Sequence, residues 1–165
     1  MRMLGAVCIL LCCTLAGCAA AEKLRREERL IRTLRSFLNA VCNSLRSTLP
    51  LISDMLAELS GQAQFSALAF LQTAADASKD GFSPERWEDA VRADDTLSPE
   101  LRGILTEVGQ ILGAMPLAEQ LSALALCDER LRTLQTDAEQ RCRCRGMLVQ
   151  RLGILGGLFL AILVL

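Results

Sequence analysis

The chain contains no histidine and no tyrosine, and only one tryptophan, among its 165 residues. Without histidine it lacks the commonest general base and the commonest zinc ligand, and without tyrosine it lacks a common proton donor. A formal net charge of -1 gives no basic field that would attract nucleic acid. We therefore expect a protein that is not an enzyme and that has no cofactor, no metal site, no small-molecule substrate and no nucleic-acid partner.

Cysteine is abundant, with eight residues, but its distribution does not indicate a disulfide scaffold. Half of the cysteines lie in one apolar run near the start, and the others lie on predicted helices among charged residues. Buried cysteine acts as a small hydrophobe, which is the role we expect for most of them. Cys142-Arg143-Cys144-Arg145 has a metal-like spacing but lacks the further ligands that zinc needs. Its arginines would lower the thiol pKa values, which leaves a redox role open.

Long apolar segments lie at both ends of the sequence. Met3–Ala21 has 19 residues and no charge, which at about 1.5 Å per residue matches a hydrocarbon core of about 30 Å. Leu152–Leu165 is also apolar, and extending it back to Met147 gives a plausible span because Arg151 can reach the headgroups. We expect transmembrane helices over residues 3–21 and 147–165, with a domain over residues 22–146 between them.

Basic residues flank both apolar segments on the side of the central domain. The positive-inside rule therefore predicts a multi-pass membrane protein whose domain faces the cytosol and whose termini lie outside. The residues that we expect to set this topology are Arg25, Arg26, Arg29, Arg32, Arg143, Arg145 and Arg151.

A bacterial lipoprotein signal is an alternative interpretation of the first segment. Leu15-Ala16-Gly17-Cys18 resembles a lipoprotein cleavage box, preceded by Arg2 and an apolar stretch. Cleavage there would attach lipid to Cys18 and export a helical domain. The basic residues that follow and the second apolar segment argue against export.

The region between the apolar segments shows helical periodicity and no strand-like alternation. We predict an all-α fold, an antiparallel bundle of about six helices whose long first and last helices continue into the transmembrane segments. The first helix should end near residue 49 before Pro50, and the last should begin after Pro116. Shorter helices are expected at 51–60, 65–77, 84–94 and 99–112, with Ser83 and Ser98 as N-caps before prolines.

Two sets of residues are candidates for contacts with other helices or proteins. Small residues permit close packing of membrane helices, and the candidates are Gly17, Gly153, Gly156 and Gly157. Residues 76–107 hold nine acidic and four basic residues, which would suit a basic partner. The candidate partner surface is Trp87, Glu88, Asp89, Asp94 and Asp95. The alternatives are a solvated acidic face and a tryptophan in the core of the bundle.

Several blocks in the order of the chain resemble the stage III sporulation protein AB family of endospore-forming bacteria. They include Arg29-Leu30-Ile31-Arg32-Thr33-Leu34-Arg35, Pro50-Leu51, Gly81 with Trp87, Leu112-Gly113 followed by Gln120, and Arg151-Leu152-Gly153-Ile154-Leu155-Gly156-Gly157-Leu158-Phe159. The last block is the most specific. Cys18 departs from the family pattern, in which a bulky residue is expected.

The resemblance implies a membrane subunit of the secretion-like channel between mother cell and forespore, required for endospore formation. The family's soluble domain is similar to the helical cytoplasmic domains of type II secretion and type IV pilus platform proteins. The implied partners are the sporulation ATPase, stage III sporulation protein AA, and other membrane subunits of the channel. The implied location is the mother cell's outer forespore membrane. A membrane-tethered adaptor unrelated to sporulation is the remaining alternative.

Overall fold

The structure is a computed structural model that describes the backbone of residues 2–47 and 50–164 and the side chains of residues 22, 25–47 and 50–141. The chain forms two compact units, one of Leu30–Gln135 and one of Met1–Arg29 with Thr136–Leu165. The first, which we call the bundle, carries nearly all of the described side chains.

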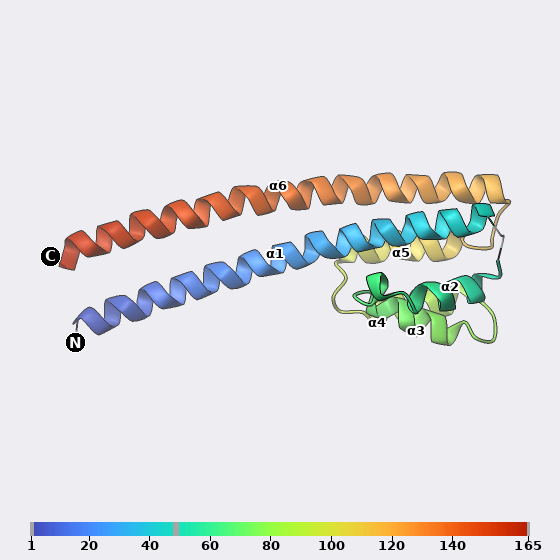
Figure 1. The fold of residues 1–165 in the computed structure, drawn as a ribbon, viewed down its shortest axis with the longest axis horizontal. Helices are drawn as coiled ribbons and strands as arrows, with labels where there is room; N and C mark the ends of the chain where they lie inside the picture. The colour runs from blue at the N-terminus through green and yellow to red at the C-terminus, as the bar shows by residue number, and fades with distance from the viewer. Residues whose placement is uncertain (1, 48–49, 165) are drawn as a thin grey trace. The chain divides into compact units, whose positions relative to one another are not determined.

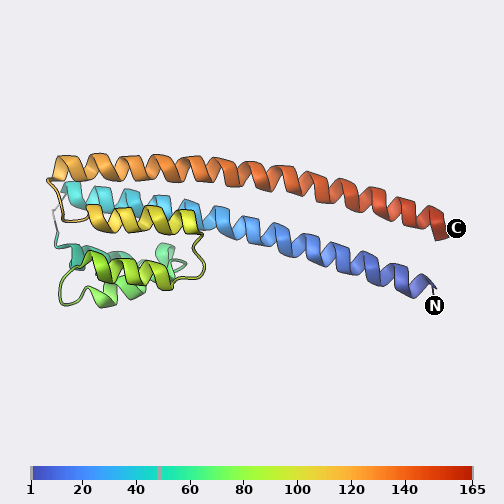
Figure 2. The same ribbon diagram turned by 180° about the vertical axis from the view of Figure 1, so that it is seen from behind.

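Six α-helices and one 3-10 turn make up the described chain, which contains no strand. The elements are α1 (Arg2–Ser47), α2 (Ile52–Ser60), the 3-10 turn η1 (Ala63–Phe65), α3 (Ala69–Ala77), α4 (Pro84–Ala93), α5 (Pro99–Ile111) and α6 (Leu117–Val164). Within the bundle, α1 runs antiparallel to α6, and α5 lies beside them (Figures 1 and 2). The short helices α2, α3 and α4 lie on the side of α1 and α5 that faces away from α6. The predicted all-α fold is thus confirmed for the described residues.

The two Ser-Pro-Glu helix starts behave differently. Ser98 caps α5 as predicted, since its hydroxyl accepts a hydrogen bond from the Leu101 N–H at 3.4 Å. Ser83 precedes α4 at the predicted place but makes no capping bond with its side chain. Its hydroxyl instead donates to the Glu85 carboxylate at 2.7 Å, so Ser83 is the predicted N-cap residue but does not cap the helix through its side chain.

The third predicted helix begins later than its periodicity indicates. The prediction was residues 65–77, but α3 starts at Ala69 and Phe65 ends the preceding 3-10 turn. Phe65 and Leu68 are both buried, and the Leu68 N–H donates to the Phe65 carbonyl at 2.9 Å. This tight turn places both apolar side chains in the core at the expense of a first helical turn.

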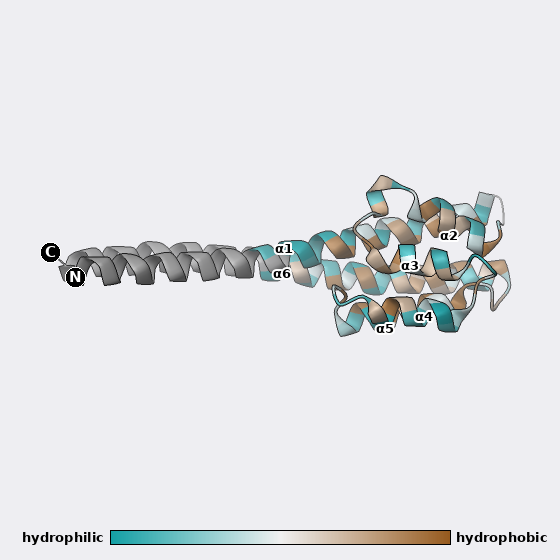
Figure 3. Ribbon diagram, turned by 90° about the horizontal axis from the view of Figure 1, so that it is seen from below, coloured by the Kyte–Doolittle hydropathy of each residue, from teal (hydrophilic) through white to brown (hydrophobic). Residues whose placement is uncertain are grey.

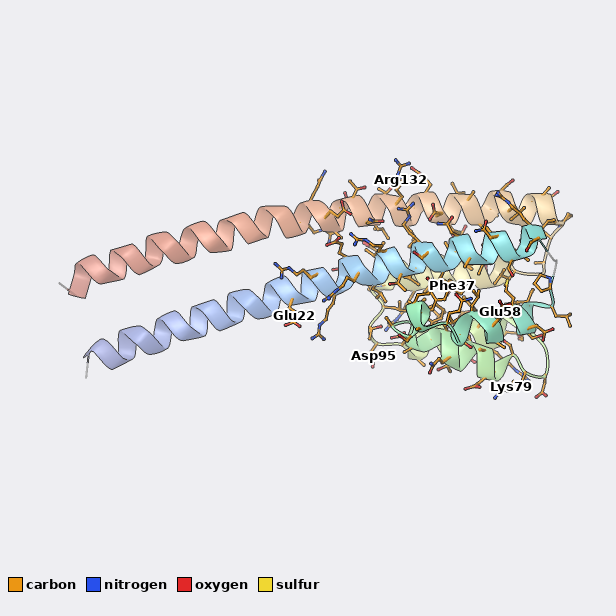
Figure 4. The ribbon with its side chains drawn as sticks, in the orientation of Figure 1. Glu22, Phe37, Glu58, Lys79, Asp95 and Arg132 are labelled. Carbon is orange, nitrogen blue, oxygen red and sulfur yellow. The ribbon has the colours of Figure 1, made fainter. Side chains whose placement is uncertain are left out.

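Aromatic side chains from successive elements form the centre of the bundle. Phe37 of α1 stacks on Trp87 of α4 at 6.4 Å between ring centroids and meets Phe65 and Phe70 edge-on. Phe70 also meets Trp87 edge-on at 5.5 Å, a geometry that aromatic quadrupoles favour. Apolar and polar segments recur along the helices of the bundle (Figure 3). Phe37 points into the bundle (Figure 4). Buried leucines complete the core, with each large side chain contributing about 1.5–3 kcal/mol.

Candidate interaction surfaces

Trp87, a candidate for the partner surface, lies in the core with only 1% of its surface exposed. Its indole N–H donates to the Leu105 carbonyl of α5 at 2.7 Å. The ring packs directly against Gly109, where a Cβ atom would fall 2.7 Å from the indole nitrogen. Trp87 therefore joins α4 to α5, and the alternative of a core tryptophan is the correct one.

Asp94 was also placed on the partner surface, but it is buried and used within the bundle. One carboxylate oxygen accepts from the Phe70 N–H at 3.2 Å, which satisfies an otherwise unpaired amide in the first turn of α3. The other accepts from the Thr96 N–H at 2.9 Å and from its hydroxyl at 2.6 Å. The Asp94 carbonyl accepts from the Arg102 guanidinium at 2.9 Å. Asp94 is therefore a structural link between three elements.

Glu88, Asp89 and Asp95 keep the exposure that a partner surface needs. The Asp89 and Asp95 side chains are 78% and 103% exposed, and Glu88 is 34% exposed. Arg92 pairs with Glu88, and Arg102 lies 3.6 Å from Asp95. Asp95 stands at the periphery of the bundle in the connection between α4 and α5 (Figure 4). We call these three residues the acidic face; Asp76, Asp80 and Glu85 are further exposed acidic residues in the same part of the sequence.

The structure contains a polar contact between α1 and α6 that the sequence did not predict. The Arg35 guanidinium donates to both oxygens of Asp128, at 3.0 and 3.2 Å, and to the Gln135 side chain at 3.0 Å. The hydrogen bond to Asp128 raises the pKa of Arg35 above its usual value. Because Arg35 and Gln135 touch, the chain enters and leaves the bundle at the same end.

Comparison with models of known protein families identifies the family of this chain. The model described as stage III sporulation protein AB matches residues 2–165. The chain belongs to the stage III sporulation protein AB family. Membership indicates a role in sporulation, so the alternative of an adaptor unrelated to sporulation is set aside. The stage III sporulation protein AB family is a sporulation family and not a known enzyme family. No curated protein and no solved structure matches the chain.

Several basic residues are expected to set the topology of this stage III sporulation protein AB family member. The structure describes the side chains of those that lie on α1. Arg25, Arg26, Arg29 and Arg32 are all exposed. Arg26 pairs with Glu22 at 3.0 Å, and this hydrogen bond lowers the pKa of Glu22. Arg143, Arg145 and Arg151 lie outside the described side chains, as do Cys18 and the packing candidates Gly17, Gly153, Gly156 and Gly157.

The predicted membrane spans, residues 3–21 and 147–165, also lie outside the described side chains. Among the residues that are described, no helix is both long and apolar enough to cross a membrane.

Two free cysteines belong to the bundle, Cys42 on α1 and Cys127 on α6. Cys127 is fully buried, and burial raises the pKa of its thiol to about 11. Burial also raises the pKa of Cys42. Neither thiol is therefore set up as a reactive thiolate, which agrees with the role of small hydrophobe. No group of potential metal ligands occurs in the described part of the chain.

The outer seam between α5 and α6 holds a shallow groove of about 620 Å³. Pro99, Glu100, Gly103 and Ile104 line it from α5, and Thr133 and Leu134 line it from α6. An ion pair between Glu107 and Arg130 bridges the two helices beside it. The sequence patterns gave no sign of this groove, because it depends on how two helices pack side by side.

Proposed function

We propose that this protein is a membrane platform and assembly subunit of the secretion-like channel between mother cell and forespore. In this proposal the domain of residues 22–146 faces the mother-cell cytosol from the outer forespore membrane and docks stage III sporulation protein AA, the ATPase. The observation that carries the proposal is the family match over residues 2–165. A helical bundle that the chain enters and leaves at one end, as the Arg35–Gln135 contact indicates, supports anchoring through both flanks.

The acidic face supports a docking role for the exposed part of the bundle. Glu88, Asp89 and Asp95 lie on or just after α4, and two of them are more than three-quarters exposed. Complementary charge between partners steers encounter and sets the register of an interface. We therefore assign the ATPase contact to this face and expect a basic surface on the ATPase.

A binding experiment with a charge-matched control tests the assignment. The full chain in detergent micelles is captured with purified stage III sporulation protein AA. The variant Glu88→Gln, Asp89→Asn, Asp95→Asn should bind at least about tenfold more weakly, with a smaller salt dependence. The control Asp54→Asn, Glu58→Gln, Glu119→Gln removes the same charge from exposed positions elsewhere and should bind like the parent. Absence of binding by the folded parent would overturn the docking role.

A topology experiment separates this proposal from the exported lipoprotein. A reporter fused after Ala77 should read as cytosolic. Labelled palmitate should not be incorporated, and Cys18→Ser should leave the protein in the membrane fraction. Palmitate incorporation that is lost in Cys18→Ser, together with an external reporter signal, would support the lipoprotein instead.

A further inference from the structure

Gly103 occupies an exposed position inside α5 where no part of the bundle needs a glycine. A Cβ atom built there meets nothing within 4 Å. Glycine within a helix destabilises the helix relative to alanine. Gly109, on the same helix, is required by the indole ring of Trp87. The missing side chain at Gly103 serves no contact within the bundle, and its effect is to keep the groove between α5 and α6 open.

An exposed leucine lies on the same face of α6 that lines this groove. Leu126 is 55% exposed and precedes Arg130 by four residues and Thr133 by seven, a spacing that puts all three on one helix face. The other large exposed apolar side chains in the described chain are Leu51 and Met115. Both of these lie in connections between helices rather than on this face. The seam thus presents a protruding leucine and an open apolar groove together.

The spacing of these features makes the surface complementary to itself. Leu126 and Leu134 lie four residues on either side of Arg130, so about 12 Å separates them along α6. If two copies of α6 pack antiparallel about a two-fold axis beside Arg130, Leu126 of each copy faces Leu134 and the groove of the other. Both contacts form at once, as an isologous interface requires.

We infer that the α5–α6 seam binds a second copy of this chain, with Leu126 of each copy inserted beside Gly103 and Ile104 of the other. The Glu107–Arg130 ion pair lies at the axis in both copies. Each copy contributes Arg130 and Glu107 at the axis. Arg130 of one copy can therefore pair with Glu107 of either copy, and like charges need not face each other. The acidic face would instead repel its own copy. It therefore stays free for a basic partner, and self-association does not depend on ATPase docking.

Photocrosslinking of the full chain in detergent micelles tests the contact directly. The amino acid p-benzoylphenylalanine replaces Leu126, and isotope-labelled and unlabelled chains are mixed before irradiation. Crosslinks between labelled and unlabelled chains should map to α5 near Gly103 or to α6 near Leu134. The same amino acid in place of Leu51, which is 72% exposed, serves as the control and should not crosslink to this seam.

Sedimentation of variants provides the second measurement. Leu126→Asp should weaken self-association about 100-fold, because each dimer loses two buried leucines at about tenfold each. Gly103→Leu should weaken it at least about tenfold by filling the groove, and should not lower the thermal unfolding midpoint of the monomer. Leu51→Asp should behave like the parent. Either seam variant associating like the parent, crosslinks that map elsewhere, or a monomeric parent chain would overturn the inference.

Discussion

Two glycines of α5 lie in opposite environments, and substitution by alanine should separate them. At Gly109 a Cβ atom would lie 2.7 Å from the indole nitrogen of Trp87 and 2.8 Å from its Cγ. Trp87 is buried and hydrogen-bonded to Leu105, so its ring cannot move away freely. We predict that Gly109→Ala lowers the free energy of unfolding by about 3 kcal/mol, measured by denaturant unfolding followed through the fluorescence of Trp87.

Gly103→Ala is the matched control for that prediction. Its Cβ atom enters open space, so only the helix propensity changes. The free energy of unfolding should rise by up to about 1 kcal/mol. Equal effects of the two substitutions would contradict the packing of Trp87 on Gly109.

The thiol of Cys127 should make stability depend on alkaline pH. Burial raises its pKa from 9.0 to about 11, so below pH 9 the thiol is protonated in both folded and unfolded chains. Between these values the unfolded thiol ionises and the folded one does not. The free energy of unfolding should therefore fall by about 3 kcal/mol as the pH rises through this range.

Comparison with Cys127→Ala isolates that effect from other alkaline titrations. The variant loses packing at every pH, but it should lack the part of the pH slope that Cys127 contributes. The measurement is denaturant unfolding at a series of pH values for both proteins. Identical slopes for parent and variant would show that the thiol is not buried as described.

At the scale of elements, Asp94 holds together the start of α3, the end of α4 and the turn toward α5. Asp94→Ala would leave the Phe70 and Thr96 amides without their acceptor. We predict a loss of about 2–4 kcal/mol in the free energy of unfolding, measured by urea denaturation. Asp95→Ala, at the fully exposed neighbour, should change it by no more than about 0.5 kcal/mol. The reverse order would contradict the assignment of these two residues.

Helix positions were readable from the sequence because local signals set them. The Ser-Pro-Glu starts and Gly81 and Gly113, which adopt positive φ angles of 118° and 77°, mark boundaries through local backbone conformation. The start of α3 was misplaced because burial of Phe65 and Leu68 overrides helical periodicity there. Such a competition between local preference and core packing is decided by tertiary contacts.

The roles of individual residues were less predictable than the helices. Asp94 and Asp95 are identical neighbours in sequence, yet one is buried and the other exposed. The spacing of Asp94 to Thr96 is typical of an Asx turn and would have indicated a structural role. No local pattern indicates that Arg35 contacts Asp128, because that contact depends on the register of two helices far apart in the chain.

For the whole molecule, charge is segregated along the chain and the acidic and basic regions suit different neighbours. Basic residues flank the two apolar segments, whereas the region from residue 76 to 107 holds nine acidic residues against four basic ones. In the proposed topology the basic flanks meet anionic headgroups and the acidic face meets a protein. The seam between α5 and α6 carries the Glu107–Arg130 ion pair, which contributes one charge of each sign. The three surfaces therefore differ in charge, and so do the neighbours proposed for them.

The contact of Arg35 with Asp128 and Gln135 spans 93 and 100 residues of sequence. During synthesis α1 therefore leaves the ribosome long before Asp128 and Gln135, the partners of Arg35 on α6, exist. Phe37 is likewise synthesised before its aromatic partners Phe65, Phe70 and Trp87. Nascent chains with exposed apolar surface are prone to aggregate and are protected by chaperones. Closure of the bundle must wait until α6 has been translated, so a chain that ends before residue 128 lacks the partners that join α1 to α6 and cannot complete the bundle.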